Sequence, residues 1–385
     1  MNFILTSNDP LIFRDGRPFG DAGHVNGGSL RWPWPSTISG VIRCKVGESR
    51  DPDFFSEDKW GTNIPEIKQL HVRTLPVWQK ADGTEWQPVF PAPADALIMP
   101  SSDDGSVRVL SFTYEDTDKH GGTDILWRNW LLPVSTETGK PARLCPDLWF
   151  GNQFYHWLEK GRLQKKTLAV KDLGLAWPSL EFRMHNGIDP DTGTVSNGRL
   201  FSSQGVRLES DAKNDQQAGT FAIGVQVDNL QSADDPVGPC HFGGERRVAT
   251  VHKIQNIFPV CPDWFVKKRF LRLLLATPGK FGNWAPDWLI PDAEQKFKTV
   301  PGTNMKVRLR GAHVQRWAAI SGWDFETRGP KATCKLVPAG SVYLLELGDE
   351  TNSQELAATL WGKSLNNDAD GFGLTYIGNI SIQGE

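Results

Sequence analysis

The first fifty residues contain a short apolar run, then a polar stretch, and then apolar residues at the spacing of a helix. Asn2–Ser7 predicts a strand, and the polar, glycine-rich stretch Asp15–Ser29 predicts a long loop. Apolar residues then recur at helical spacing between 38 and 46, with Ser36 in the position of an N-cap. The chain is therefore expected to open with a strand, a glycine-rich loop and a short amphipathic helix.

The rest of the chain divides into an irregular stretch and a regular one. Residues 47–180 mix Pro, Trp and short apolar runs, so we expect few strands and little long helix there. Residues 181–209 predict two strands joined by a polar tip. Helical spacing predicts helices at Pro262–Ala276 and Ser353–Trp361. Strands are predicted at 220–228, 247–254, 305–314, 331–338, 341–347 and 371–382.

This element order predicts an α+β fold. A β-α-β-β-α-β order occurs about once in each half, which is typical of a ferredoxin-like module with a four-stranded sheet and two helices on one face. We expect two such modules with loop insertions, one over residues 1–180 and the other over 181–385.

Composition and charge narrow the class of protein. Of 385 residues, 39% are hydrophobic and 23% charged, which excludes a disordered chain and a membrane protein. The net charge is −3, yet residues 241–340 carry seventeen Lys and Arg against seven Asp and Glu. That asymmetry indicates either a basic face or an ordinary solvated surface.

Cysteine usage and the N-terminus predict a reduced, cytoplasmic protein without a membrane anchor. The five cysteines are odd in number and form no CxxC pair, which argues against a disulfide framework and a zinc site. Residues 1–10 lack the features of a signal peptide.

No motif gives a clear catalytic or metal site, and none points to a cofactor. Asp189 begins a stretch similar to a calcium loop, but the sixth position is Thr194 and the twelfth is Leu200, so a hairpin turn is favoured. His24 and His185 could act as acid or base, although polar contacts are favoured for both. Gly371 and Gly373 suit close backbone approach or a bulge.

The N-terminal stretch is more informative. Arg14 and Arg17 flank a turn between the first strand and the glycine-rich loop, ahead of the predicted helix start at Ser36. Guanidinium groups, backbone amides and a helix N-terminus together suit phosphate groups. The alternative is that Arg14 pairs with Asp15 in a structural turn.

Six motifs, taken in order, resemble one family. They are PLIFRDGRPFG (10–20), WPWPSTISGVIR (32–43), HFGGERR (241–247), LLLATPGKFGNWAPDW (273–288), SGWDFETRGPKATCKLVPAGSVYLLEL (321–347) and GFGLTYIG (371–378). The chain is similar to the third subunit of the Cmr complex, a RAMP-superfamily protein of type III-B CRISPR effectors. Residues 47–180 carry no motif of the family.

The resemblance implies a fold, a role and partners. The fold is two RRM-related ferredoxin-like modules with a β-hairpin thumb, placed near 184–207. The role is non-catalytic: the subunit grips the 5′ repeat-derived tag of the CRISPR RNA and meets the target RNA indirectly. The protein partners are the large polymerase/cyclase-like subunit and the first backbone RAMP subunit.

The resemblance also implies candidate RNA-binding residues, since single-stranded RNA is held by basic groups, amides and stacking side chains. They are Arg14, Arg17, His24, Ser36, Thr37, Ser39, Arg43, Arg183, His185, Asn186, Gly243, Gly244, Arg246, Arg247, Lys331, Gly371 and Gly373.

Two other functions remain open. A metal-independent endoribonuclease that processes precursor CRISPR RNA would need His24 or His185 beside a scissile phosphate. A carbohydrate-binding β protein would account for the sixteen Trp residues, but the missing signal peptide and the basic window disfavour it.

Overall fold

The chain folds into two compact units that interleave along the sequence. The computed structural model describes residues 1–14, 26–56, 58–101, 105–116, 130–143, 145–210, 217–265, 267–324, 326–380 and 382. Unit 1 comprises Met1–Trp86, Trp177–Ile257 and Ile320–Thr333, and unit 2 comprises Gln87–Ala176, Phe258–Ala319 and Cys334–Glu385. These units differ from the expected division at residue 180, because 87–176 packs with the C-terminal sheet and 177–257 with the N-terminal one.

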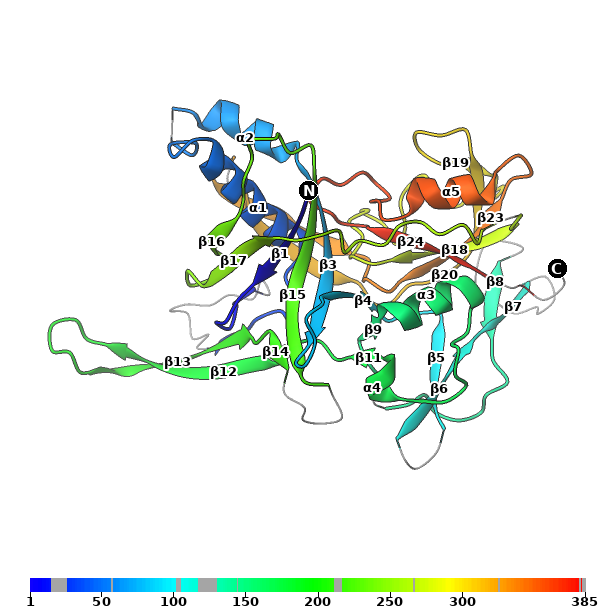
Figure 1. Cartoon of the computed structure of the whole chain (residues 1–385), viewed down its shortest axis with the longest axis horizontal. Coiled ribbons are helices and arrows are strands. Elements are labelled where there is room, and N and C mark those ends of the chain that lie inside the picture. Colours follow the sequence, from blue (N-terminus) through cyan, green and yellow to red (C-terminus); the bar gives the residue numbers. More distant parts are fainter. Residues whose placement is uncertain are drawn as a thin grey trace. The chain divides into compact units, whose positions relative to one another are not determined.

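Unit 1 is built on an antiparallel sheet. Its strands are β1 (Asn2–Thr6), β3 (His71–Lys80), β14 (Glu209–Ser210), β15 (Gly219–Asp228), β16 (Gly238–His241) and β17 (Val248–Lys253). The order is β3-β15-β1-β17-β16, with β14 beside β15 (Figure 1). On one face Ile4, Val77 and Ala222 form a buried cluster. The strands predicted at 2–7, 220–228 and 247–254 are confirmed.

Two helices accompany this sheet. Helix α1 (Pro35–Arg50) contacts β3 and β16, burying Ile38, Ile42 and Val46, and α2 (Trp60–Lys68) packs on α1. The predicted N-cap at Ser36 is wrong: the N-cap is Trp34, without a side-chain cap, because Pro35 fits the first helical turn.

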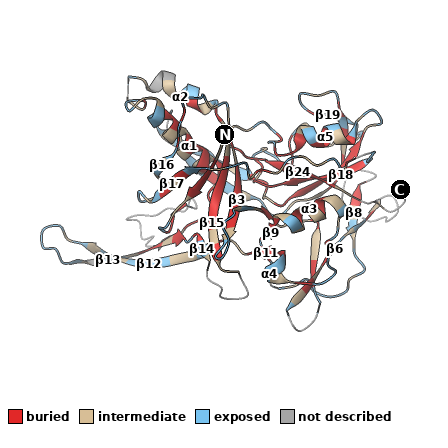
Figure 2. Ribbon diagram, viewed as in Figure 1, coloured by how far each residue is buried: buried red, intermediate tan, exposed pale blue. Residues whose placement is uncertain are grey.

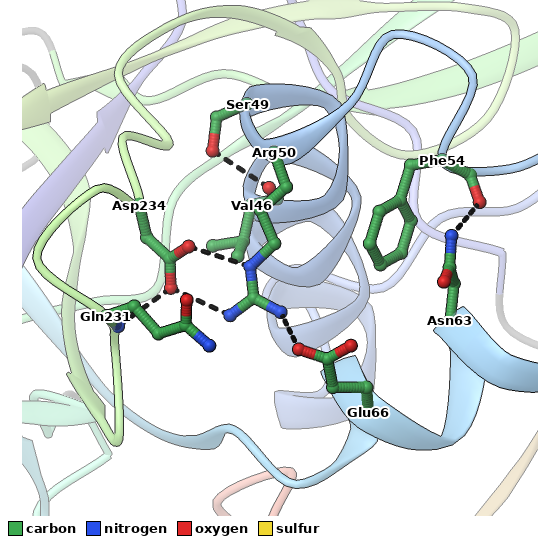
Figure 3. Close-up of polar contacts among 8 residues, drawn as sticks. All are labelled: Val46, Ser49, Arg50, Phe54, Asn63, Glu66, Gln231 and Asp234. Carbon is green, nitrogen blue, oxygen red and sulfur yellow. Dashed lines mark hydrogen bonds and ion pairs between the residues drawn. The ribbon is translucent and has the colours of Figure 1, made fainter.

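The C-terminal end of α1 is fixed by a polar cluster (Figure 3). Arg50 donates to both carboxylate oxygens of Asp234, at 2.7 and 2.9 Å, and to Glu66 at 2.6 Å. The Asp234 side chain is only 1% exposed. Its hydrogen bond with Arg50 is the main reason that the pKa of Asp234 is lowered, with the Gln231 amide assisting. The cluster ties α1, α2 and the loop before β16 together.

A long hairpin extends from unit 1. It pairs β12 (Leu180–Ile188) with β13 (Val195–Val206), and β13 also pairs in parallel with β2 (Asn26–Gly27). Figure 2 shows the outer part of the hairpin exposed and its base buried. At the tip, Asp189 accepts amide hydrogen bonds from Asp191 and Thr192, which lower its pKa. The predicted hairpin and its tip turn are therefore confirmed.

Unit 2 contains a five-stranded antiparallel sheet in the order β19-β20-β23-β18-β24. Its strands are β18 (Phe270–Leu275), β19 (Lys298–Thr299), β20 (Lys306–His313), β23 (Val342–Leu347) and β24 (Thr375–Asn379), and α5 (Ser353–Leu360) precedes β24. The predictions for β20, β23 and α5 are confirmed, and β24 is shorter than predicted. Strands β21 (Ala318–Asp324) and β22 (Gly329–Leu336) form a separate hairpin, of which residues 320–333 belong to unit 1. Strand β22 starts two residues before the predicted strand.

The helix predicted at Pro262–Ala276 is wrong. Residues 270–275 form the central strand β18, and all six are buried. A strand covered on both faces has a continuous apolar run, which hydrophobic spacing cannot separate from a buried helix. Its charged residue, Arg272, is buried too and pairs with Asp95 at 2.6 Å.

Residues 47–180 hold more structure than predicted. In unit 2 they contribute β4 (Gln87–Pro91), β5 (Ala96–Pro100), β6 (Ser106–Ser111), β7 (Thr113–Asp116), β8 (Leu131–Val134), β9 (Leu148–Phe150), α3 (Gly151–Lys160), β10 (Leu168–Ala169), α4 (Val170–Leu173) and β11 (Gly174–Leu175). Helix α3 packs on β24, and the Trp157 indole donates to Asp95. The expectation of few strands is wrong because these strands are short and interrupted by proline. The fold is a mixed α/β one made mostly of strands.

Candidate functional site

Three backbone segments of unit 1 meet around Arg14. Leu11 forms an antiparallel bridge with Val206 at the hairpin base, and Arg14 forms one with Ser29. The Phe13 amide donates to Ser29 Oγ at 2.9 Å. The short stretch 11–14 is thus held on both sides, and it ends at the exposed side chain of Arg14.

The loop Gly243–Arg247 lies against this stretch. The Gly244 amide donates to the Ile12 carbonyl at 2.7 Å, and the rings of Phe13 and Phe242 meet edge to face at 5.1 Å. Gly243 has φ of +83°, and a β-carbon there would lie 2.4 Å from the Ile12 oxygen. Glycine is required at 243 both for its backbone conformation and for this close approach.

The same loop presents two arginines. Arg246 is exposed and has φ of +52°, a conformation that non-glycine residues seldom adopt. Arg247 is half-buried, and its Nη2 lies 3.6 Å from Glu245 Oε2. The loop therefore turns Arg246 outward on the segment that packs against the stretch ending at Arg14.

The hairpin base adds polar and ring groups. Ser202 and Ser203 are buried where β13 pairs with β2. His185 Nε2 lies 2.7 Å from Ser203 Oγ, and its ring stacks on Phe201 at 5.0 Å. The next residue toward the tip, Asn186, is exposed, and nearer the base the exposed Arg183 pairs with Glu181.

Two candidates on α1 have structural roles. Arg43 Nη2 donates to the Leu70 carbonyl at 2.9 Å and to the Lys68 carbonyl at 3.4 Å, so it satisfies carbonyls at the end of α2. Ser39 is fully buried, and its hydroxyl donates to the Ser36 carbonyl. Ser36 and Thr37 are half-exposed in the first turn of α1.

The remaining candidates lie elsewhere. Gly371 and Gly373 are buried in unit 2, where the Gly371 carbonyl accepts from Thr277 and Gly373 packs on Phe281. Lys331 is exposed on β22. Arg17 and His24 lie outside the described residues. The structure thus brings together Arg14, the loop Gly243–Arg247 and the hairpin base around His185.

Sequence reasoning missed an apolar face on the hairpin. The register places the exposed Phe182, Met184 and Leu200 on one side of the two strands, and the exposed pair Ile188 and Val195 follows beyond a register shift. The alternation of Phe182, Met184 and Ile188 was the available signal. A hairpin extending away from its sheet leaves both faces open, so apolar alternation there does not indicate a core.

Neither metal ligands nor a membrane span stand out within the described ranges. Those residues include no group of three or more His, Cys, Asp or Glu side chains arranged to hold a metal ion. No helix there combines the length and apolar character needed to cross a membrane.

Comparisons with known proteins establish the family. A family model described as CRISPR-associated protein (Cas_Cmr3) matches residues 3–380. Among solved structures, a chain of type III-B Cmr-beta bound to cognate target RNA and AMPPnP matches with TM-score 0.47 and 14% identity, covering 89% of this chain and 86% of that one. A chain of Cmr-beta bound to cognate target RNA matches with TM-score 0.41 and 15% identity, with the same coverage. No curated protein matches. Because the family model spans nearly the whole chain, this protein belongs to the Cmr3 family of CRISPR-associated proteins, a subunit family of type III-B CRISPR effectors.

Proposed function

We propose that this effector subunit binds the 5′ tag of the CRISPR RNA through the surface formed by residues 11–14, 243–247 and the hairpin base, here called the tag surface. One observation carries the proposal: the Gly243–Arg247 loop packs on the Ile12 carbonyl, on the stretch that ends at Arg14. Arg14 and Arg246 are both exposed there. Cations on two interlocked backbone segments suit the phosphates of a single strand.

The groups on this surface match the needs of single-stranded RNA. Bases of single strands stack on aromatic rings and hydrogen-bond through their edges. The stacked rings of His185 and Phe201 offer such contacts on one face of the hairpin, and the exposed Asn186 offers them on the opposite face. The close approach at Gly243 fixes the loop, so little ordering of the protein would accompany binding.

The fold supports a finer proposal. In each unit four strands, taken in chain order, occupy the sheet order 2-3-1-4: β3-β15-β1-β17 and β20-β23-β18-β24. Ferredoxin-like modules share that antiparallel order. Unit 1 keeps the first connecting helix, α1, and unit 2 keeps the second, α5. We infer two modified ferredoxin-like modules with β12–β13 as the thumb.

The role is structural rather than catalytic. The subunit works in the cytoplasm as part of the ribonucleoprotein, contacting the large subunit and the first backbone subunit. His185 lies against Ser203 and stacks on Phe201, and we assign it to RNA contact.

The test is the salt dependence of binding to a tagged RNA. Arg14→Ala with Arg246→Ala should weaken binding and lower the magnitude of the salt slope by about 1.4, because each phosphate that is no longer neutralised on a single strand lowers it by roughly 0.7. Lys45→Ala with Lys80→Ala is the matched control, because it removes two unit 1 cations paired with Glu48 and Asp82. An unchanged slope in the arginine variant, or an equal loss in the control, contradicts the proposal.

A cleavage assay separates the processing alternative. The purified chain should leave repeat RNA intact in EDTA and with divalent cations. Cutting at a single site in EDTA that disappears in His185→Ala would establish an endoribonuclease instead.

A further inference from the structure

A buried carboxylate in unit 2 holds three guanidinium groups. Glu346 on β23 is 2% exposed and pairs with Arg269 at 2.9 Å, with Arg308 at 2.6 Å, and with Arg310. Burial alone raises its pKa, but hydrogen bonds from the three arginines outweigh burial and lower it. Glu346 is therefore ionised and holds all three guanidinium groups.

Two of these arginines, Arg269 and Arg308, reach the surface in fixed positions. Arg308 lies directly across from Glu346 in the sheet, and its guanidinium stacks on Phe297 at 4.7 Å. Lys306 and Arg308 alternate along β20 and so share a face, and Lys306 is exposed. The side chain of Arg269 is 64% exposed. Because the guanidinium groups are already held in place, a bound ligand would cost less side-chain conformational entropy.

A cavity of about 640 Å³ adjoins these residues. One wall is Lys267, Lys268 and Arg269, and the other consists of residues of the 348–354 turn. The walls are joined by a hydrogen bond from the Lys268 amide to Ser353 Oγ at 3.1 Å. At the cavity wall, Lys267 has φ of +53°, in the left-handed region that non-glycine residues seldom adopt.

The cations, not the end of α5, give this cavity its anion preference. Asn352 Oδ1 already accepts the amides of Gln354 and Glu355, at 2.9 and 3.1 Å. The lining includes two lysines and one arginine against the carboxylate of Asp349. The basic residues of β20 adjoin it, because the Lys306 carbonyl accepts from Gly348 at 2.9 Å.

We propose that this cavity, lined by Lys267, Lys268 and Arg269, is a second phosphate-binding site of the protein. Its ligand carries several phosphates: either an RNA backbone or the polyphosphate of a free nucleotide. The site lies wholly in unit 2 and goes beyond the tag surface, which lies in unit 1. It needs no tag sequence, because phosphates carry no base information.

The test uses the full chain and two probes, an eight-nucleotide single-stranded RNA without repeat sequence and ATP, with adenosine as the uncharged counterpart. The test variant is Lys267→Ala with Lys268→Ala, which leaves the Glu346 network intact. Lys165→Ala with Lys166→Ala is the matched control, a neighbouring pair of exposed lysines in the same unit. Both pairs are also combined with Arg14→Ala and Arg246→Ala. Binding by the second site is then measured without the contribution of the tag surface.

We expect the test variant to lose at least fivefold in affinity for one probe, with adenosine unbound. Loss for the RNA, with a slope lower by about 1.4, assigns an RNA backbone, and loss for ATP alone assigns a nucleotide. Unchanged binding of both probes, or equal losses in the control pair, overturns the site. Binding of an oligoglutamate peptide that exceeds binding of both probes would overturn it too, in favour of an acidic protein surface.

Discussion

Individual residues of unit 1 fall into two groups, those that hold backbone segments together and those that remain exposed. Arg43 and Arg50 are fixed by helix carbonyls and carboxylates, whereas Arg14 and Arg246 are exposed on loops. The sequence alone could not separate these groups. The carbonyl of Leu70 bound by Arg43 and the carboxylates bound by Arg50 lie 16 to 184 residues away along the chain, and local patterns carry no record of such contacts.

Asp234→Asn tests the first group. The substitution removes the buried carboxylate that neutralises the Arg50 guanidinium. We therefore expect the free energy of unfolding at pH 7 to fall by about 3 kcal/mol. The folded-state pKa of Asp234 is lowered, so the stability it contributes is present above its unfolded value of about 3.9 and is lost as pH falls through the folded value. The difference from the parent should therefore shrink below about pH 4 in urea unfolding. Asp235→Asn, an exposed neighbour, should change little at either pH, and a constant difference would contradict this role.

Gly243→Ala tests the close approach beneath the tag surface. A β-carbon at this positive φ would press on the Ile12 carbonyl and break the Gly244 hydrogen bond, costing about 2 kcal/mol. Tagged RNA should bind more weakly as well, because Arg246 would shift relative to Arg14. Gly238→Ala is the control: its φ is +114°, yet open space surrounds it, so it should cost less and leave RNA binding intact. Equal effects of the two variants on RNA binding would contradict the claim that the close approach at Gly243 positions Arg246.

At the scale of elements, local periodicity predicted several strands correctly, mistook one strand for a helix, and gave no positions for the strands between residues 71 and 175. Strands such as β15 and β17, and the hairpin β12–β13, were predicted because their alternation is local. Strand β18 was mistaken for a helix because burial on both faces removes the alternation. Short strands between 87 and 175 pair with one another, such as β4 with β9 and β5 with β6, and no local signal separates them from loops.

Shortening the hairpin tests whether its outer part is independent of the fold. Joining Met184 to Ser202 through an Asn-Gly turn removes the stacked His185 and Phe201 and everything beyond them, but keeps the buried Ser202 and Ser203. We expect the melting temperature to change by less than about 3 °C, because little buried surface is lost, while affinity for tagged RNA falls. Thermal unfolding and RNA titration of the same preparation check both. An aggregated variant would mean that the outer hairpin supports folding.

At the scale of the whole molecule, neither unit is continuous in sequence. In unit 1, the N-terminal strand β1 is paired on both edges only when β15 and β17 are present. Unit 2 takes its five-stranded sheet from residues after 258 and its helix α3 from the middle of the chain. A domain boundary at residue 180 was predicted because the same order of helices and strands occurs about once in each half of the chain. Which distant segments share a core depends on packing, and spacing along the chain does not reveal it.

Photo-crosslinking tests the central claim most directly. The effector would be reconstituted with CRISPR RNA carrying 4-thiouridine at single tag positions, and the crosslinked peptides of this subunit would be mapped by mass spectrometry. We predict crosslinks from the tag to peptides containing residues 11–14, His185 or Phe201, and 243–247, all on the tag surface, and their loss in the Arg14→Ala, Arg246→Ala variant. Tag crosslinks that avoid these three segments while the subunit remains assembled would contradict the account.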